Sequence, residues 1–250
     1  MLIKRRMLLS SLMLLSSAAV TAAQPGDQST VINRGIYASI SGGLDFIRTN
    51  GNQRLILLDS IPEYYTGHQA YKTSGSVGFG FGLEREFRSN LSWQIGLAGY
   101  FNSAVKASGH RWEFGLPDFD NFTYKYQVKS SRAVVTGKLL GTYQEHYHPY
   151  MSGELGASFN RASGYSEKPL LDEEFPMEPF SAHTQTSFSW GLGLGVDRDI
   201  CTVLRLGIGY QFVDLGRASL GRSPVQETHN TLSIPHLYDH QVRVQLTALI

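Results

Sequence analysis

The stretch that decides the fold runs from residue 187 to residue 196 and reads SFSWGLGLGV. Large apolar residues occupy every second position: Phe188, Trp190, Leu192, Leu194 and Val196. Serine or glycine fills each position between them. Because successive side chains of a β-strand point to opposite faces, this stretch predicts a strand with one apolar face and one face of small residues.

The same alternation recurs along the chain in eight segments of roughly ten residues. The segments are 36–46, 76–84, 92–102, 132–139, 151–160, 187–196, 204–212 and 238–250. The second, fourth and sixth segments are followed by short connections, at 85–90, 142–148 and 197–202. The first, third, fifth and seventh are followed by long ones, at 47–73, 103–123, 161–182 and 216–235. The pattern predicts an all-β fold, an eight-stranded antiparallel transmembrane up-and-down β-barrel over residues 34–250, with short periplasmic turns and four long extracellular loops.

The fourth segment is irregular. Its apolar residues occupy even positions from Tyr124 to Val128 and odd positions from Ala133 to Leu139. A β-bulge near Ser130 and Ser131 would reconcile the two patterns, because one extra residue shifts the side chains to the other face.

The residues on the polar face are mostly too small to form a charged coat in water, but they suit a narrow lumen. The apolar face carries large aromatic residues near both ends of the segments, as membrane barrels do at the two interfaces. Those near the long loops are Phe46, Phe101, Phe159, Phe188, Trp190, Tyr210, Phe212 and Tyr238; those near the short turns are Trp93, Tyr143 and Tyr147. We therefore expect the apolar face to contact lipid.

The first 23 residues have the composition of a secretory signal peptide. Lys4, Arg5 and Arg6 precede an apolar run over 7–20, and small residues follow at 21–23. Cleavage after Ala22 or Ala23 would leave 24–33 as a short lead-in to the barrel. Export in this way, together with a barrel, predicts the cell outer membrane as the location.

Charge and cysteine content exclude several classes of protein. The mature chain would carry 19 Lys and Arg against 21 Asp and Glu, which does not favour a nucleic-acid partner. Cys201 is the single cysteine, so no internal disulfide can form. No phosphate-binding loop or zinc-protease motif occurs, and we expect no cofactor.

Three segments of the last third resemble the OmpA-like, opacity-protein family of small surface barrels. They are 206–216 (LGIGYQFVDLG), 191–197 (GLGLGVD) and 240–244 (HQVRV). The resemblance implies a barrel without catalytic activity that is inserted by periplasmic chaperones and the barrel-assembly machinery. The chain departs from the family at Ile250, where such barrels usually end in an aromatic residue, and we expect no peptidoglycan-binding domain.

Five charged residues fall on the face predicted to line the lumen: Glu84, Lys138, Glu154, Arg205 and Arg243. Burial of an unpaired charge is costly, so we expect a salt-bridged network that plugs the barrel. The alternative is a gated ion path of low conductance.

Histidines and acids outside the predicted strands give weaker indications. His146 and His148 lie in a short turn without the further ligands that a metal site needs, so no metal is expected. His183, His229, His236 and His240 are expected near the long-loop rim. The third long loop carries Glu167, Asp172, Glu173, Glu174 and Glu178 among Pro169, Pro176 and Pro179. This loop is expected to be mobile and soluble, or to contact divalent cations at the lipopolysaccharide surface.

The sequence thus predicts a non-enzymatic surface barrel that contributes to membrane structure and contacts a host or environmental ligand through its long loops. Its expected partners are outer-membrane lipid and lipopolysaccharide. The alternatives are a lipid-modifying barrel enzyme and a narrow channel. The enzyme alternative lacks the His-x-Ser pair of the lipid A deacylase barrels, because no histidine here precedes serine by two residues.

Overall fold

The computed structural model describes residues 35–49, 51–56, 61–68, 70–88, 90–171, 175–176, 180–222 and 230–250. The predicted signal peptide and lead-in lie outside these residues. The same is true of Asp172, Glu173, Glu174, Glu178, Pro179 and His229. Within the described residues, no helix has the length and hydrophobicity needed to cross a bilayer.

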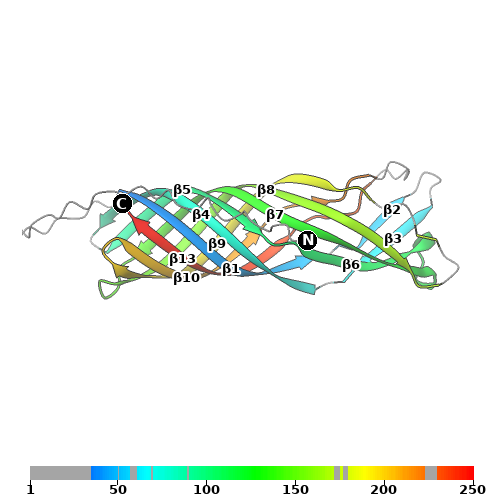
Figure 1. Cartoon of the computed structure of the whole chain (residues 1–250), viewed down its shortest axis with the longest axis horizontal. Helices are drawn as coiled ribbons and strands as arrows, with labels where there is room; N and C mark the ends of the chain where they lie inside the picture. The colour runs from blue at the N-terminus through cyan, green and yellow to red at the C-terminus, as the bar shows by residue number, and fades with distance from the viewer. Residues whose placement is uncertain are drawn as a thin grey trace, which may run out of the picture. The chain divides into compact units, whose positions relative to one another are not determined.

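Eight antiparallel strands form a closed ring (Figure 1). They are β1 (Ile36–Thr49), β4 (Ala70–Arg88), β5 (Leu91–Asn102), β7 (Asp120–Gly141), β8 (Tyr147–Pro169), β9 (His183–Cys201), β10 (Leu204–Asp214) and β13 (Tyr238–Leu249). Each strand pairs with its neighbours in this order, and β13 pairs with β1 from Tyr238 opposite Arg48 to Leu249 opposite Tyr37. The predicted eight-stranded up-and-down barrel is confirmed.

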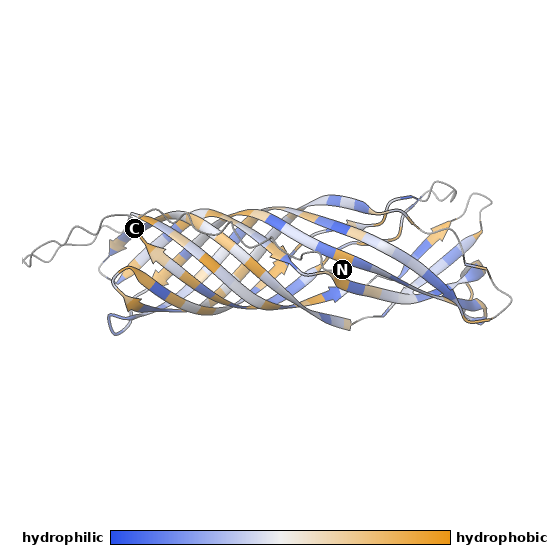
Figure 2. Cartoon of the chain, viewed as in Figure 1, coloured by the Kyte–Doolittle hydropathy of each residue, from blue (hydrophilic) through white to orange (hydrophobic). Residues whose placement is uncertain are grey.

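The row of apolar side chains on β9 faces outwards. Leu192 is 60% exposed, Leu194 62% and Val196 42%, whereas the intervening glycines face the lumen. Glycine is needed there because the lumen is narrow: a Cβ atom on Gly195 would lie 2.6 Å from the ring of Tyr150. Figure 2 shows hydrophobic residues alternating with less hydrophobic ones along the strands of the barrel. An apolar outer wall that no other element covers is the surface of a barrel that spans a membrane.

Aromatic residues lie on the outer wall at both ends of this band. Phe212 stacks on Tyr238 at 5.8 Å between ring centroids and meets Trp190 edge-on at 5.7 Å. Trp93, Tyr143 and Tyr147 are exposed near the other end. These positions match the two predicted interfacial belts.

The connections at the short-turn end are short, as the sequence predicts, although the strands continue into the predicted turns; the long connections differ more from the prediction. They contain β2 (Gln53–Ile56), β3 (Pro62–Gly67), β6 (Val105–Trp112), the 3₁₀ helices η1 (Glu113–Gly115) and η2 (Pro117–Phe119), β11 (Ala218–Ser219) and β12 (Ser233–Ile234). β7 and β8 continue among them and reach 22 and 23 residues, about 70 Å each, well over the span of a membrane strand. We call this ordered part beyond the membrane band the extension. The predicted loops at 47–73, 103–123, 161–182 and 216–235 are therefore largely structured.

The predicted bulge at Ser130 and Ser131 is wrong. Even-numbered side chains of β7 point inwards throughout, from Tyr124 through Ser130 to Leu140. The register of β7 with β8 shifts only between Lys125 and Gln127, opposite Gly164, whose φ is +69°. The sequence pattern reverses because the apolar face changes sides: it lies outside along the membrane band and inside along the extension.

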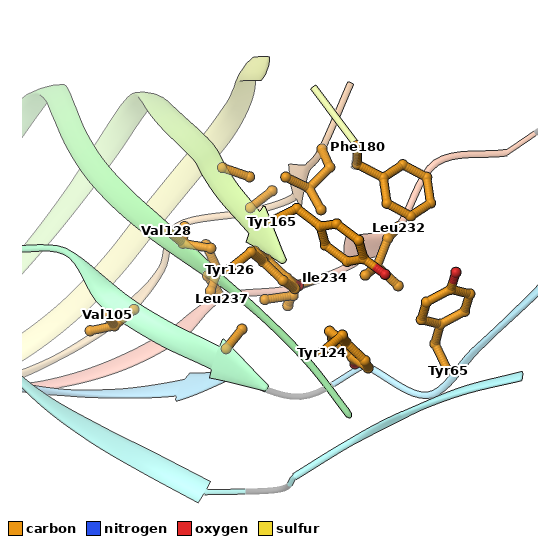
Figure 3. Packing of buried hydrophobic residues seen from close by; sticks show 14 of the residues in the cluster. Tyr65, Val105, Tyr124, Tyr126, Val128, Tyr165, Phe180, Leu232, Ile234 and Leu237 are labelled. Atoms are coloured by element: carbon orange, nitrogen blue, oxygen red, sulfur yellow. The ribbon is translucent and has the colours of Figure 1, made fainter. Parts of the chain in front are cut away.

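The inside of the extension is an apolar core, which we call the cap. Its members are Ile47, Leu55, Tyr65, Val105, Ala107, Tyr124, Tyr126, Val128, Ala162, Tyr165, Phe180, Val213, Leu215, Ala218, Leu220, Leu232, Ile234 and Leu237. Figure 3 shows the tyrosines packed beside Phe180 and the aliphatic residues of the last long connection. Tyr165 meets Phe180 edge-on at 4.9 Å, and Tyr65 meets Tyr124 at 5.4 Å.

The side-chain amide of Gln53 joins the two sides of the cap. Its Nε2 donates a hydrogen bond to the carbonyl of Thr231 at 2.9 Å, and its Oε1 accepts one from the amide of Ser233 at 2.8 Å. The amide thus binds the backbone of the last long connection as a neighbouring strand would. This links β2 to the β11–β12 hairpin without a further backbone ladder.

Candidate functional site

The lumen near the short turns holds a buried ion-pair layer centred on Arg205. Its guanidinium lies 3.2 Å from Oε2 of Glu84 and 3.0 Å from Oδ1 of Asp199. Gln94 donates a further hydrogen bond to Glu84 at 2.5 Å. Both sequence-predicted residues in this layer, Glu84 and Arg205, are therefore in direct contact.

Lys138 makes a separate pair in the same part of the lumen. Its Nζ lies 2.8 Å from Oδ2 of Asp197 and 3.8 Å from the centre of the Tyr150 ring. Asp197 was expected in a turn, but β9 continues to Cys201, so its side chain faces the lumen. The alternation of the polar face, continued two residues past Gly195, reaches Asp197 and could have located it.

A second layer lies nearer the cap. Nε of Arg132 is 2.9 Å from Oε1 of Glu154. The guanidinium groups of Arg132 and Arg243 each lie 4.1 Å from the centre of the Tyr100 ring. Both also donate to Oε1 of Gln241. Arg132 is not among the five lumen charges predicted from the sequence, and nothing local in the sequence pairs it with Glu154.

Two carboxylates close this polar interior beneath the cap. Nδ2 of Asn102 donates to Asp45 and to Asp239, at 3.2 Å each, and Ser76 donates to Asp45 at 2.9 Å. The cavity between the ion-pair layers measures only about 60 Å³ and is lined by polar groups such as Tyr37 and Gln245. It has room for a few water molecules and no larger solute.

A buried cluster around Arg111 lies in the extension. The guanidinium is fully buried over the ring of Phe122, and it lies 3.4 Å from Glu63, 3.4 Å from Glu113 and 3.6 Å from Glu167. Burial raises the pKa of Glu63 above its ordinary value, and Arg111 offsets only part of that effect. The cluster fixes the strand ends around the cap.

Glu167 is not the solvent-facing loop residue that the sequence predicted. It lies in β8, and its side chain points inwards, where it accepts a hydrogen bond from Tyr165 as well as pairing with Arg111. Contact of this carboxylate with cations at the membrane surface is excluded by its burial. The reason is again that β8 continues past the membrane band to Pro169.

The histidines occupy unrelated positions. His148 is buried, with Nδ1 3.3 Å from the hydroxyl of Thr142 and Nε2 2.9 Å from Asp199. Arg205 also binds Asp199. This series of contacts from hydroxyl to imidazole to carboxylate therefore stabilises the turn and does not present a nucleophile. His146 is exposed in the turn. His183, His236 and His240 lie toward the long-connection end, and no group of three metal-ligating side chains occurs in the described part of the chain.

The far end of the extension is apolar and exposed, and we call it the apolar tip. It comprises Ile56, Ile61, Phe114, Leu116, Phe119, Leu170, Leu171 and Phe175. The rings of Phe114 and Phe119 are 5.3 Å apart, and the amide of Leu170 donates to the carbonyl of Asn121 at 2.7 Å. Three connections thus present large apolar side chains to solvent, a pattern typical of contact sites.

No protein-family model matches the chain, and no curated protein matches its sequence. Solved structures match it in fold. OprG of Pseudomonas aeruginosa is 14% identical over 86% of this chain and 96% of its own, with a TM-score of 0.48. The outer membrane protein AlkL is 8% identical over 92% and 97%, with a TM-score of 0.46. The outer membrane protease OmpT of Escherichia coli is 8% identical over 90% and 99%, with a TM-score of 0.44. All three of these structures are of outer-membrane proteins.

Proposed function

We propose that this chain is a non-enzymatic barrel of the outer membrane, which contacts host or environmental surfaces through its apolar tip. The observation that carries the proposal is the tip itself. Phe114, Leu116 and Phe119 are exposed in and between the two short 3₁₀ helices at the end of an ordered extension. Large apolar side chains that a rigid scaffold holds in water are the usual anchors of a protein contact.

The closed lumen supports a role outside the membrane over passage through it. Two ion-pair layers, the Asp45–Asp239 bridge and the cap follow one another along the interior. If the lumen conducted ions, several of these contacts would have to break each time that it opened. We therefore expect planar-bilayer recordings to show no discrete conductance, and regular single-channel steps would contradict this part of the proposal.

The position of the hydroxyl–imidazole–carboxylate arrangement supports the non-enzymatic part. Thr142, His148 and Asp199 lie at the short-turn end, away from the tip, and the imidazole of His148 is buried. Lipid A mass spectra from cells with and without the protein are expected to be the same. A change in acylation would overturn the non-enzymatic assignment.

The tip is tested with the triple variant Phe114→Ser, Leu116→Ser, Phe119→Ser. The matched control is Asp118→Ser, which changes an exposed polar residue of the same turn. Fractionation should place every variant in the outer membrane, and antibody labelling should establish equal surface abundance. Adherence to alkyl-coated beads and to epithelial-cell monolayers is expected to fall severalfold in the triple variant only. Equal adherence of the triple variant and the native protein would refute the proposal.

A further inference from the structure

The outward side of β6, β7 and β8 carries five exposed cations, which we call the cationic face. They are Lys106, Lys125, Lys129, Arg161 and Lys168. Lys129 stands directly opposite Arg161 in the β7–β8 register, and Lys125 lies opposite Ser166. Two like charges held side by side repel each other unless a counter-ion joins them.

No acid of these three strands neutralises the cationic face. Glu154 and Glu167 point into the barrel and the extension, where they pair with Arg132 and Arg111. Asp120 is bonded to His110 at the tip end of β6 and β7. Within the described residues, none of the five cations forms an ion pair. The described part of the chain therefore leaves these five charges available to an anionic partner.

The position of Lys129 and Arg161 indicates what that partner is. The next outward pair towards the short turns is Ser131 and Phe159, and Phe101 lies beside Ser131 on β5. Phe101 and Phe159 are exposed on the membrane band. The cations therefore begin about 7 Å, two residues, beyond the last lipid-facing aromatic row. Lipid headgroups lie at this depth, next to the hydrocarbon.

A hollow on the same face lies farther from the membrane. Lys125, Lys168 and His68 line it together with the hydroxyl groups of Ser108 and Thr123, and its volume is about 250 Å³. Its floor includes Gly109, where a Cβ atom would lie 1.7 Å from the carbonyl oxygen of Thr66. Cationic side chains around a small hollow suit a phosphate group or a phosphorylated sugar.

We propose that the cationic face binds the phosphate groups of an outer-leaflet glycolipid. Lys129 and Arg161 hold the phosphate next to the acyl chains, and the hollow at Lys125 and Lys168 takes the phosphorylated sugar beyond it. Charge complementarity and continuity with the lipid-facing band together select this occupant. The inference rests on the proposed outer-membrane location and not on contact through the apolar tip.

The test is native mass spectrometry of the full barrel in uncharged detergent, with diphosphorylated lipid A as the probe. The comparison ligand is chemically dephosphorylated lipid A with the same acyl chains. The variant Lys129→Gln/Arg161→Gln is expected to bind diphosphorylated lipid A about tenfold more weakly, which corresponds to the loss of one charge-assisted contact. The charge-matched control Arg54→Gln/Arg198→Gln, which removes two exposed cations elsewhere, is expected to bind it unchanged.

Each outcome decides the proposal. Equal binding of the two lipids by the native protein, or equal affinity of the double variant and its control, would overturn it. Displacement of lipid A by inorganic phosphate at comparable concentration would assign the site to free phosphate and overturn the lipid as occupant. The triple tip variant should bind lipid A like the native protein, so failure of surface contact and failure of lipid binding are separate results.

Discussion

The lumen and the cap are two interiors enclosed by the same strands. The inward face of β7 carries Arg132 and Lys138 in the lumen, but Tyr124 and Tyr126 in the cap. The backbone pairing with β8 continues from one to the other. What differs is the medium that contacts the outer face of the strands, which is lipid along the membrane band and water along the extension. The surroundings, and not the backbone, decide which face of a strand is apolar.

The two interiors are stabilised by different physics. The lumen depends on specific partners, because a buried charge is tolerated only beside a counter-charge or other polar groups that satisfy it. The cap depends on burial of apolar area, which is non-directional and tolerates changes that keep the volume. The lumen should therefore respond most strongly to loss of one charge, and the cap to loss of volume.

The largest expected effect is in the lumen. Arg205→Ala leaves Glu84 and Asp199 without their shared cation and should lower the free energy of unfolding by about 3–5 kcal/mol. Urea unfolding in phospholipid vesicles, followed by tryptophan fluorescence, measures it. The control Arg198→Ala, on the outward face of β9, should change it by under about 0.5 kcal/mol. Similar losses in both variants would show that the lumen does not depend on its ion pairs.

The cap should lose stability without loss of the barrel. Tyr165→Ala removes a ring that packs on Phe180 and Tyr124, at an expected cost of about 3 kcal/mol to the extension. Limited proteolysis should then cut the extension, while the barrel keeps its heat-modifiable mobility in gel electrophoresis. The exposed Phe114→Ala serves as control. Unfolding of the whole barrel by Tyr165→Ala would contradict the separation of the two interiors.

A smaller effect on stability is expected at the β7–β8 register shift, which lies between the lumen and the cap. A Cβ atom on Gly164 or on Gly137 would meet nothing within 4 Å, but only Gly164 has a positive φ. Gly164→Ala should therefore cost about 1 kcal/mol through backbone strain alone, and Gly137→Ala should be close to neutral. Chemical denaturation of the two variants side by side isolates the strain. Equal stability would mean that the shift can relax.

The weakest effect is a pH dependence confined to the extension. Burial raises the folded-state pKa of Glu63, so its contribution to stability is fully present below the ordinary glutamate pKa and is lost as the pH rises through the higher value. Proteolysis of the extension should therefore be slower at about pH 5 than at about pH 7. Glu63→Gln should reduce this difference, after correction for the pH profile of the protease. An opposite trend would mean that pairing with Arg111 outweighs burial.

The membrane band could be predicted from the sequence almost strand by strand. Alternation with period two is a local signal, and residues such as Leu192 and Gly193 report the two faces directly. The lumen charges could be assigned to the interior for the same reason. Their partners could not, because Arg132 and Glu154 are brought together only by the register of β7 with β8.

The extension escaped prediction because its pattern is reversed. Tyr124, Tyr126 and Val128 alternate with the period of a strand. Their apolar side chains lie at even positions, however, whereas those of the membrane band on the same strand lie at odd positions. In the sequence, such a change of parity resembles the effect of a bulge. The Arg111 cluster joins carboxylates from β3, η1 and β8, so nothing local marks it. The apolar tip lay in predicted loops, where exposed apolar residues have no periodicity to identify them.

The continuity of β7 and β8 has a mechanical consequence. The hydrogen bonds of an antiparallel pair run perpendicular to the strands. Their ladder extends from Leu140 opposite Tyr150 to Phe122 opposite Pro169, with one register shift between Lys125 and Gln127. A pull on the far end of the molecule therefore loads many bonds together in shear, instead of opening them one after another. Tension applied at the far end of the extension is carried along β7 and β8 into the wall of the barrel, and the membrane becomes the anchor.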